Sequence, residues 1–383
     1  MTPASAGSHG SLEAALWEAA GKASRLMEPK SLGVLCRKPL LDEDCPEVSD
    51  VDLLSIWEEP EEHPERMTIE SPAGRVFVDV LWVPASKMFD PIEAASYKIL
   101  PHLLLESETV WMRSDSVQPF VENIKHSMYE KTIWGRRIGH QLNFGDAALQ
   151  EASKNLDFPP AALFFLQTAH SYYAMALADC LKQSTMALLT RPITKLKRMA
   201  AETGCELGSL LVANLHLETE PVASLGALDR VYAAVSARCS ARQPEGVKGR
   251  ASGHYAYSLS PLELEYRKMV AGALVSRGDF ANANFYIRFW AYSLSRCPVI
   301  LEDARQGRNP SFYVPFGGFK ESLQAACPEI IDDMELILGG RMTEEEAKES
   351  IDGTVSFRRM VEDQIQARGI SLTSPRDAGA EGA

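Results

Sequence analysis

The 383-residue sequence has no surplus of positive charge. Its 39 Lys and Arg residues stand against 52 Asp and Glu residues, which gives a formal net charge of −13 at pH 7. A protein that binds duplex DNA through phosphate contacts needs such a surplus, so we expect no duplex DNA partner, although a local basic pocket stays open. The sequence also lacks GxGxxG and GxxxxGK[ST] patterns. Their absence argues against Rossmann and P-loop domains.

Paired cysteines and long apolar runs are missing as well. The seven cysteines form no CxxC pattern, and scattered cysteines of this kind are typical of reduced thiols in a cytosolic protein. No apolar run approaches the roughly 20 residues of a membrane span. The N-terminus lacks the basic start and apolar stretch of a signal peptide. We therefore expect a cytoplasmic protein with no membrane partner.

Strand-like and helix-like patterns occupy different parts of the chain. Residues 31–36 and 51–56 each predict one strand, and residues 66–84 predict two strands joined at Ser-Pro-Ala-Gly. Residues 11–27 have the apolar spacing of an amphipathic helix, and from Pro91 onward helical spacing dominates. Asp279 is a suitable N-cap for one of the later helices. These patterns predict an α+β fold, in which a small mixed β-sheet domain is followed by an α-helical bundle domain.

The stretch VSDVDLLSIW places two aspartates in a predicted strand. Side chains alternate across a strand, so Asp50 and Asp52 share one face. Asp79 lies among apolar neighbours in RVFVDVLWV. If the two strands pair, three carboxylates converge, and like charges that close require a cation between them. Their hard oxygen atoms favour Mg²⁺.

Two observations would weaken this metal hypothesis. One is a Lys or Arg that already neutralises the three acids. The other is a solvated acidic surface, since residues 42–65 contain eleven acids and no Lys or Arg. Asp79 argues against the second alternative, because a carboxylate buried in an apolar strand needs a partner.

The order of these features resembles the nucleotidyltransferases of the DNA polymerase beta superfamily. A strand, a loop, SDVDLL and a further strand with a third acid follow one another within roughly residues 11–120. The similarity is greatest to the small-molecule enzymes that adenylylate antibiotics. The segment LLLESETVWMRSD is similar to the short strand pair at the close of the family's catalytic domain. With this resemblance we divide the chain into a flexible N-terminus (1–10), a nucleotidyltransferase-like catalytic domain (11–120), an α-helical domain (121–368) and a disordered tail (369–383).

The resemblance also implies roles for the three acids. Asp50 and Asp52 would be metal ligands, and Asp79 would be the third ligand and the base for the acceptor hydroxyl. Two Mg²⁺ ions and a nucleoside triphosphate (NTP) as co-substrate are implied with them. The reaction would be an in-line attack of a hydroxyl on the α-phosphate.

The nucleotide contacts are less clear than the acids. The family usually has Gly-Ser after the first strand, where a helix N-terminus and the serine hydroxyl hold the triphosphate. Here Gly33 is followed by Val34, so Gly33 either allows close backbone approach to phosphate or marks a strand irregularity. Arg37, Lys38 and Ser49 are the further candidates in this domain. The missing serine leaves the affinity for triphosphate open.

A basic cluster in LLTRPITKLKRM supplies two more candidates. Lys195 and Lys197 could reach the triphosphate from the helical domain, as basic residues do in the family. The alternative is a helix end whose cations favour the macrodipole.

Three functions follow from the sequence. The first is an Mg²⁺-dependent nucleotidyltransferase that moves a nucleoside monophosphate (NMP) group from an NTP to a hydroxyl of a small molecule. The second is a transferase that acts on RNA ends or protein hydroxyls, which the negative net charge disfavours for a long RNA. The third is a noncatalytic scaffold that binds nucleotide or a partner through a degenerate transferase domain.

Overall fold

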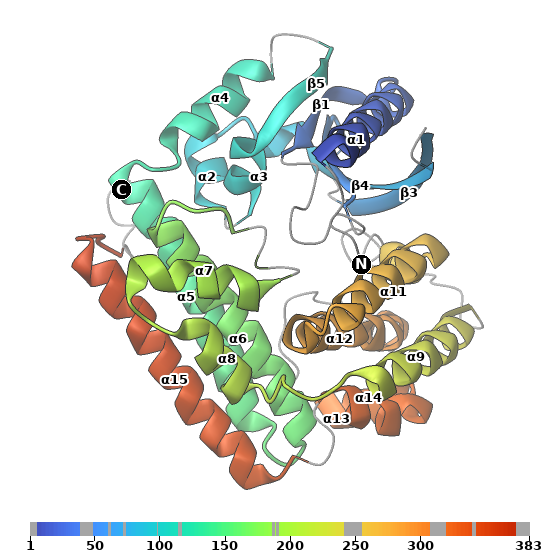
Figure 1. The fold of residues 1–383 in the computed structure, drawn as a ribbon, viewed down its shortest axis with the longest axis vertical. Helices are drawn as coiled ribbons and strands as arrows, with labels where there is room; N and C mark the ends of the chain where they lie inside the picture. The colour runs from blue at the N-terminus through green and yellow to red at the C-terminus, as the bar shows by residue number, and fades with distance from the viewer. Residues whose placement is uncertain are drawn as a thin grey trace. The chain divides into compact units, whose positions relative to one another are not determined.

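The computed structural model describes residues 6–38, 49–59, 63–71, 74–97, 99–113, 117–185, 188, 191–240, 255–306, 319–338 and 342–372. The chain forms two compact units. Unit 1 contains residues 1–129 and 248–273, and unit 2 contains residues 130–247 and 274–383. Figure 1 shows a strand-containing part and a larger helical part, which confirms the α+β class. Unit 1 therefore includes a segment, 248–273, that was predicted to belong to the helical domain.

Unit 1 is built on a five-stranded mixed sheet. Its strands are β1 (Ser31–Arg37), β2 (Val51–Trp57), β3 (His63–Ser71), β4 (Gly74–Pro84) and β5 (Ser107–Met112), in the order β3-β4-β2-β1-β5. The β2–β4 pair is parallel and the other three pairs are antiparallel. The strands predicted from residues 31–36, 51–56 and 66–84 are all present. Gly74 opens β4 with a φ of 104°, a backbone conformation that glycine adopts without steric cost.

One face of this sheet is covered by α1 (Ala6–Met27). The helix buries residues at three- and four-residue steps, namely Leu16, Ala19, Ala20, Ala23 and Met27. They pack against the strand residues whose side chains point to the same side, among them Val51, Leu53, Val78 and Val80. Because side chains alternate along a strand, Asp52 and Asp79 point to the opposite face. Helix α1 begins at Ala6, inside the segment expected to be flexible.

The opposite face receives the returning segment. Its described part comprises a helical turn at residues 255–258 and α11 (Pro261–Ser276), which belongs to unit 1 as far as Ala273. The ring centroids of Phe77 on β4 and Tyr266 on α11 lie 5.3 Å apart. The segment thus contacts the face that carries the aspartates.

Three short helices complete the described part of unit 1. They are α2 (Pro91–Ser96), α3 (Leu100–Leu105) and α4 (Gln118–Ser127). The segment LLLESETVWMRSD was expected to form a short strand pair, but it contains the end of α3 and the single strand β5. The reason is that Leu100–Leu105 has apolar residues without alternation and Pro101 in its first turn, which suits a helix.

The described part of unit 2 is helical. Its helices are α5 (Lys131–Lys154), α6 (Pro159–Cys180), α7 (Pro192–Thr203), α8 (Leu207–Asn214), α9 (Val222–Ser240), α12 (Phe280–Arg305), α13 (Phe319–Ala326), α14 (Ile331–Leu338) and α15 (Glu344–Ala367). An ion pair between Arg137 and Asp179, 2.7 Å long and fully buried, joins α5 to α6. The Asp279 side chain accepts a hydrogen bond from the Asn282 amide, so the predicted N-cap of α12 is confirmed.

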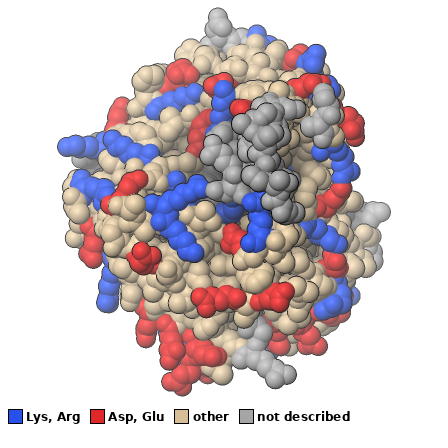
Figure 2. Space-filling model, viewed as in Figure 1, with Lys and Arg blue, Asp and Glu red and all other residues tan. Residues whose placement is uncertain are grey.

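The surface of the described chain mixes both signs of charge. On the face shown in Figure 2, Lys and Arg side chains lie between Asp and Glu side chains, and acidic side chains gather at the lower end. Among the described residues, no helix combines the length and the apolar character that crossing a membrane requires. The predicted tail comprises residues 369–383, of which 373–383 lie outside the described residues.

Candidate functional site

Asp50, Asp52 and Asp79, named here the acid cluster, converge on one face of the sheet of unit 1. Asp50 directly precedes β2, and Asp52 lies opposite Asp79 in the parallel pairing of β2 with β4. Neighbouring strands lie about 4.8 Å apart, and residues in register point to the same side. The strand pairing that the metal hypothesis requires is therefore present.

An arginine from the edge strand already lies between two of these acids. Arg66 on β3 is paired in register with Asp79. Its Nη1 donates to Asp50 Oδ2 at 3.2 Å and its Nη2 donates to Asp79 Oδ2 at 3.1 Å. The Arg66 side chain is only 2% exposed. This residue is a cation that neutralises part of the acid cluster, and it was not among the candidates predicted from the sequence.

Asp52 is paired with a different arginine. Arg37, at the end of β1, donates from Nη1 to Asp52 Oδ2 at 2.7 Å and from Nε to Glu106 Oε2 at 2.7 Å. Lys38 lies 2.6 Å from a carboxylate oxygen of Glu108. Both cations were candidates for contact with a triphosphate. In this structure they are paired with acids of their own unit.

The returning segment holds Arg66 from its other side. Glu263 on α11 is 1% exposed, and its Oε2 accepts from Arg66 Nε at 2.6 Å while its Oε1 accepts from Arg267 Nε. Tyr257 donates its hydroxyl to Asp79 Oδ2 at 3.0 Å. The Tyr266 ring centroid lies 3.8 Å from the Arg66 guanidinium carbon, which is a cation–π distance.

The electrostatics of the acid cluster are unfavourable despite these partners. Burial raises the pKa of Asp79 to about 7, with Arg66 opposing the rise and Glu263 adding to it. Burial and the neighbouring Asp52 raise the pKa of Asp50 to about 6. Asp79 Oδ1 is buried and accepts no hydrogen bond. At Glu263, burial acts to raise the pKa, but Arg267 and Arg66 together lower it.

The balance of charges in the surrounding network is consistent with the raised pKa values of Asp50 and Asp79. The ion-paired network contains five carboxyl groups, those of Asp50, Asp52, Asp79, Glu106 and Glu263. It contains three guanidinium groups, those of Arg37, Arg66 and Arg267. Among the described residues, this network thus has more carboxylates than cations. A negative excess at a partly buried site favours either a proton or a further cation.

The acid cluster does not fit a metal ion in the observed arrangement. Its oxygen donors have the right chemistry for Mg²⁺, and Asp79 Oδ1 lacks a partner. However, the described residues include no group of three or more His, Cys, Asp or Glu side chains that could hold a metal ion. Arg66 and Arg37 hold the Oδ2 atoms of all three aspartates. Arg66 therefore supplies much of the positive charge that the sequence hypothesis assigned to a metal ion.

The remaining candidate residues lie in different surroundings. The pairing register of β1 shifts between Ser31 and Gly33, and a side chain at Gly33 would collide with Met112. Ser49 lies in the connection just before Asp50. Lys195 and Lys197 lie on α7, in unit 2. Contact of these four residues with a nucleotide stays a prediction.

The raised pKa values predict how stability depends on pH. Ordinary aspartates titrate near 3.9, so the folded protein holds protons on Asp79 and Asp50 more tightly than the unfolded chain does. This contribution to stability is complete below pH ~4 and is lost as the pH rises through about 6 and 7. We expect the free energy of unfolding, measured in urea, to fall between pH 5 and pH 8. The fall should be smaller in Asp79→Asn, and an equal fall in both proteins would contradict the assignment.

Comparisons with known proteins find no family and one weak structural likeness. No family model matches the chain, and no curated protein matches it. One solved structure that it resembles is a nucleotidyltransferase-like protein from Exiguobacterium sibiricum, at 14% sequence identity and a TM-score of 0.26. The match covers 49% of this chain and 66% of the other, slightly less than two thirds of its length. A likeness this weak supports no conclusion about activity.

Proposed function

We propose that the protein transfers an NMP group from an NTP to a hydroxyl of a small molecule, with the acid cluster as its reaction centre. The observation that carries this proposal is the meeting of Asp50, Asp52 and Asp79 at the neighbouring parallel strands β2 and β4, where the described residues supply more carboxylates than cations. The excess of negative charge suits a site that works with additional cations. The SDVDLL motif, followed by a third acid, Asp79, on the neighbouring strand β4, supports the same function.

In the proposed transfer, Asp79 acts as the base. The acceptor oxygen attacks the α-phosphorus, a new oxygen–phosphorus bond forms, and the bond from that phosphorus to the β-bridging oxygen breaks. Pyrophosphate leaves, and the hydroxyl proton passes to the carboxylate of Asp79. Its pKa near 7 suits a group that takes and releases a proton at neutral pH.

Dependence on Mg²⁺ is part of the proposal. Two such ions, bound with the triphosphate, would supply neutralisation of its phosphate charge. In the observed arrangement, Arg66 occupies the Oδ2 atoms of Asp50 and Asp79, and the described residues include no group that could hold such an ion beside it.

The test is incubation of the purified protein with each labelled NTP, Mg²⁺ or Mn²⁺ and a panel of acceptors. The panel contains hydroxylated metabolites, RNA and proteins, and pyrophosphate release is followed. We expect metal-dependent release with a small hydroxylated acceptor. If pyrophosphate were released only with RNA ends or protein hydroxyls, the acceptor would be one of these rather than a small molecule. An absence of release with every acceptor would reject the transferase.

A noncatalytic scaffold is the second candidate, and Arg66 is the observation that favours it. A buried guanidinium on Asp50 and Asp79 lets the acid cluster fold without a metal ion. A scaffold would bind NTP without turnover, and its affinity would be the same in Asp50→Asn and Asp79→Asn. Equilibrium dialysis with labelled NTP, run beside the pyrophosphate assay, separates the two functions.

A further inference from the structure

We propose that the returning segment is an autoinhibitory cover of the acid cluster, in which Tyr257 occupies the position where an acceptor hydroxyl has to meet Asp79. Transfer then requires a state in which residues 255–273 have left the sheet face. The inference rests on the proposed function, because it concerns the regulation of the same reaction centre. It makes the observed arrangement a closed form of the protein.

Neither oxygen of Asp79 is available in the observed arrangement. Oδ2 accepts hydrogen bonds from the Tyr257 hydroxyl at 3.0 Å and from Arg66 Nη2 at 3.1 Å. A carboxylate has about two lone-pair sites on each oxygen, so these two donors fill those of Oδ2. Oδ1 is buried and accepts no hydrogen bond from the described residues. The hydrogen bonds, rather than complete burial, close the base, since 27% of the side chain is exposed.

Tyr257 contacts Asp79 as an acceptor would. Its hydroxyl donates to the carboxylate at 3.0 Å, within the range at which a general base contacts the proton that it takes. An acceptor hydroxyl needs the same lone pair. Arg66 is held in register with Asp79 by the sheet, whereas Tyr257 belongs to the returning segment. Displacement of Tyr257 therefore opens the base without disturbing the strands.

The rest of the segment closes a second acid. The Tyr266 hydroxyl hydrogen-bonds to Asp50, and the Tyr266 ring centroid lies 3.8 Å from the guanidinium carbon of Arg66. Glu263 accepts from Arg66 Nε at 2.6 Å. Glu263 and Tyr266 lie on one helix, α11. A single displacement of this helix would therefore release both contacts together.

The cover can leave without leaving a buried charge unpaired. When α11 separates from the sheet, Arg66 keeps its ion pairs with Asp50 and Asp79. Glu263 keeps its ion pair with Arg267 on its own helix. A buried charge that loses its last partner is costly, and neither side of this contact loses it. The arrangement therefore favours a reversible opening.

The first experiment measures the labelling of carboxyl groups by a water-soluble carbodiimide with glycinamide, followed by peptide mass spectrometry. Tyr257→Phe removes the hydroxyl and keeps the ring. We expect labelling of both Asp79 and Asp50 to be at least about tenfold faster in this variant, the effect of losing one hydrogen bond to a charged group. Asp50 decides the result, because its contacts come from Tyr266 and Arg66. An unchanged rate at Asp50 would overturn the proposal.

Two references make this labelling specific. Glu70, an exposed acid on β3, reacts in the same sample and should have one rate in every protein. Tyr97→Phe removes a hydroxyl at the end of α2 in the same unit and should label as the unchanged protein does. Faster labelling of Asp50 in both variants would show a general loosening of unit 1 and would contradict the cover.

A crosslink tests the cover in the opposite direction. Arg75 on β4 and Glu265 on α11 form an exposed ion pair, so cysteines at these two positions can be joined by a bismaleimide. We expect Asp50 and Asp79 to label at least about tenfold more slowly after the crosslink, because the open form is removed. The double variant without crosslinker and the unchanged protein treated with it are the controls. Equal labelling with and without the crosslink would contradict a cover that opens.

The proposed function adds a kinetic measurement. In Tyr257→Phe the KM for the acceptor should fall about tenfold with little change in kcat, because a closed form lowers the apparent affinity by the fraction of open molecules. A lower kcat at an unchanged KM would make Tyr257 a positioning residue and overturn the cover. A nucleotide transferred to Tyr257 itself would make this hydroxyl an acceptor and would also overturn it.

The outcomes for the two proposals can be told apart. Labelling that rises in Tyr257→Phe and falls after the crosslink, without pyrophosphate release by any of the proteins, would reject the transferase and keep the cover. Pyrophosphate release at the same rate with and without the crosslink would keep the transferase and reject the cover.

Discussion

Arg66→Gln, in the absence of metal ions, is expected to lower the free energy of unfolding by about 3–5 kcal/mol, the usual cost of removing one partner from a buried ion pair. The substitution leaves Glu263 with Arg267 alone and leaves Asp50 and Asp79 without their guanidinium. Urea unfolding followed by tryptophan fluorescence measures the effect. Trp57 and Trp82, whose ring centroids lie 5.1 Å apart in the same sheet, contribute to that signal.

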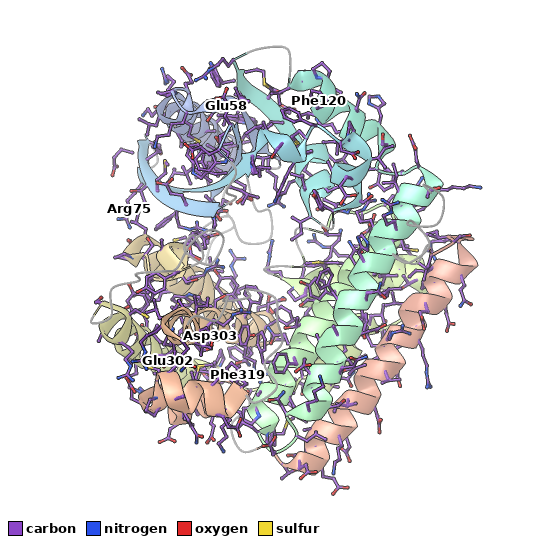
Figure 3. The ribbon with its side chains drawn as sticks, turned by 180° about the vertical axis from the view of Figure 1, so that it is seen from behind. Glu58, Arg75, Phe120, Glu302, Asp303 and Phe319 are labelled. Carbon is purple, nitrogen blue, oxygen red and sulfur yellow. The ribbon has the colours of Figure 1, made fainter. Side chains whose placement is uncertain are left out.

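The control for this loss is Arg75→Gln. Arg75 lies near the start of β4 and pairs with Glu265, but its side chain is 40% exposed; it is labelled in Figure 3. Exposed ion pairs contribute at most about 1 kcal/mol. If both variants lost the same small amount, Arg66 would not be the counter-charge of the acid cluster.

Asp79→Asn is expected to lower the rate of nucleotidyl transfer by about 100- to 10,000-fold, the range associated with loss of a general base. The change should have little effect on stability at pH 7. The introduced amide is neutral, and the pKa of about 7 means that Asp79 is already protonated in part of the molecules. Pyrophosphate release at saturating NTP and acceptor is the measurement.

The matched control is Glu70→Gln, an exposed acid on β3 of the same sheet. It should transfer at the rate of the unchanged protein. Equal rates in Asp79→Asn and the unchanged protein would remove Asp79 from the reaction. If Asp79→Asn were unfolded at pH 7, its loss of transfer rate would result from unfolding and not from the missing base.

The sheet and its acid cluster could be predicted from local patterns. Alternation in VSDVDLLSIW places Asp50 and Asp52 on one face, and two adjoining strand signals surround Ser-Pro-Ala-Gly. Such patterns depend on neighbours within a few residues, so a single sequence carries them. The pairing of β2 with β4 was a condition of the metal hypothesis, and the structure shows that pairing.

Arg66 was missed although the sequence contained a signal for it. In a hairpin the partners are fixed by the turn, and the pairing of Ser71 with Gly74 sets Arg66 opposite Asp79. The register set by this turn places Arg66, a cation, directly opposite Asp79. The metal hypothesis took account of the acids alone and therefore assigned their neutralisation to a metal.

Glu263 and Tyr257 could not be found in this way. Glu263 is separated from Arg66 by 197 positions, and Tyr257 by 191. The helical spacing of residues 262–273 predicts a helix but not the sheet face on which it packs. Residues 255–258 form a helical turn, and residues 241–254 lie outside the described residues. The contact depends on the path of the chain between distant elements, which local patterns do not encode.

The central claim is that Arg66 and the acid cluster form one electrostatic unit, and a double-mutant cycle between Arg66→Gln and Asp79→Asn tests it most directly. The free energy of unfolding of all four proteins is measured in urea at pH 7 without divalent ions. We predict that the two substitutions are not additive and that the coupling energy is at least about 1 kcal/mol, within the range for residues in contact. Additive effects within about 0.3 kcal/mol would contradict the account.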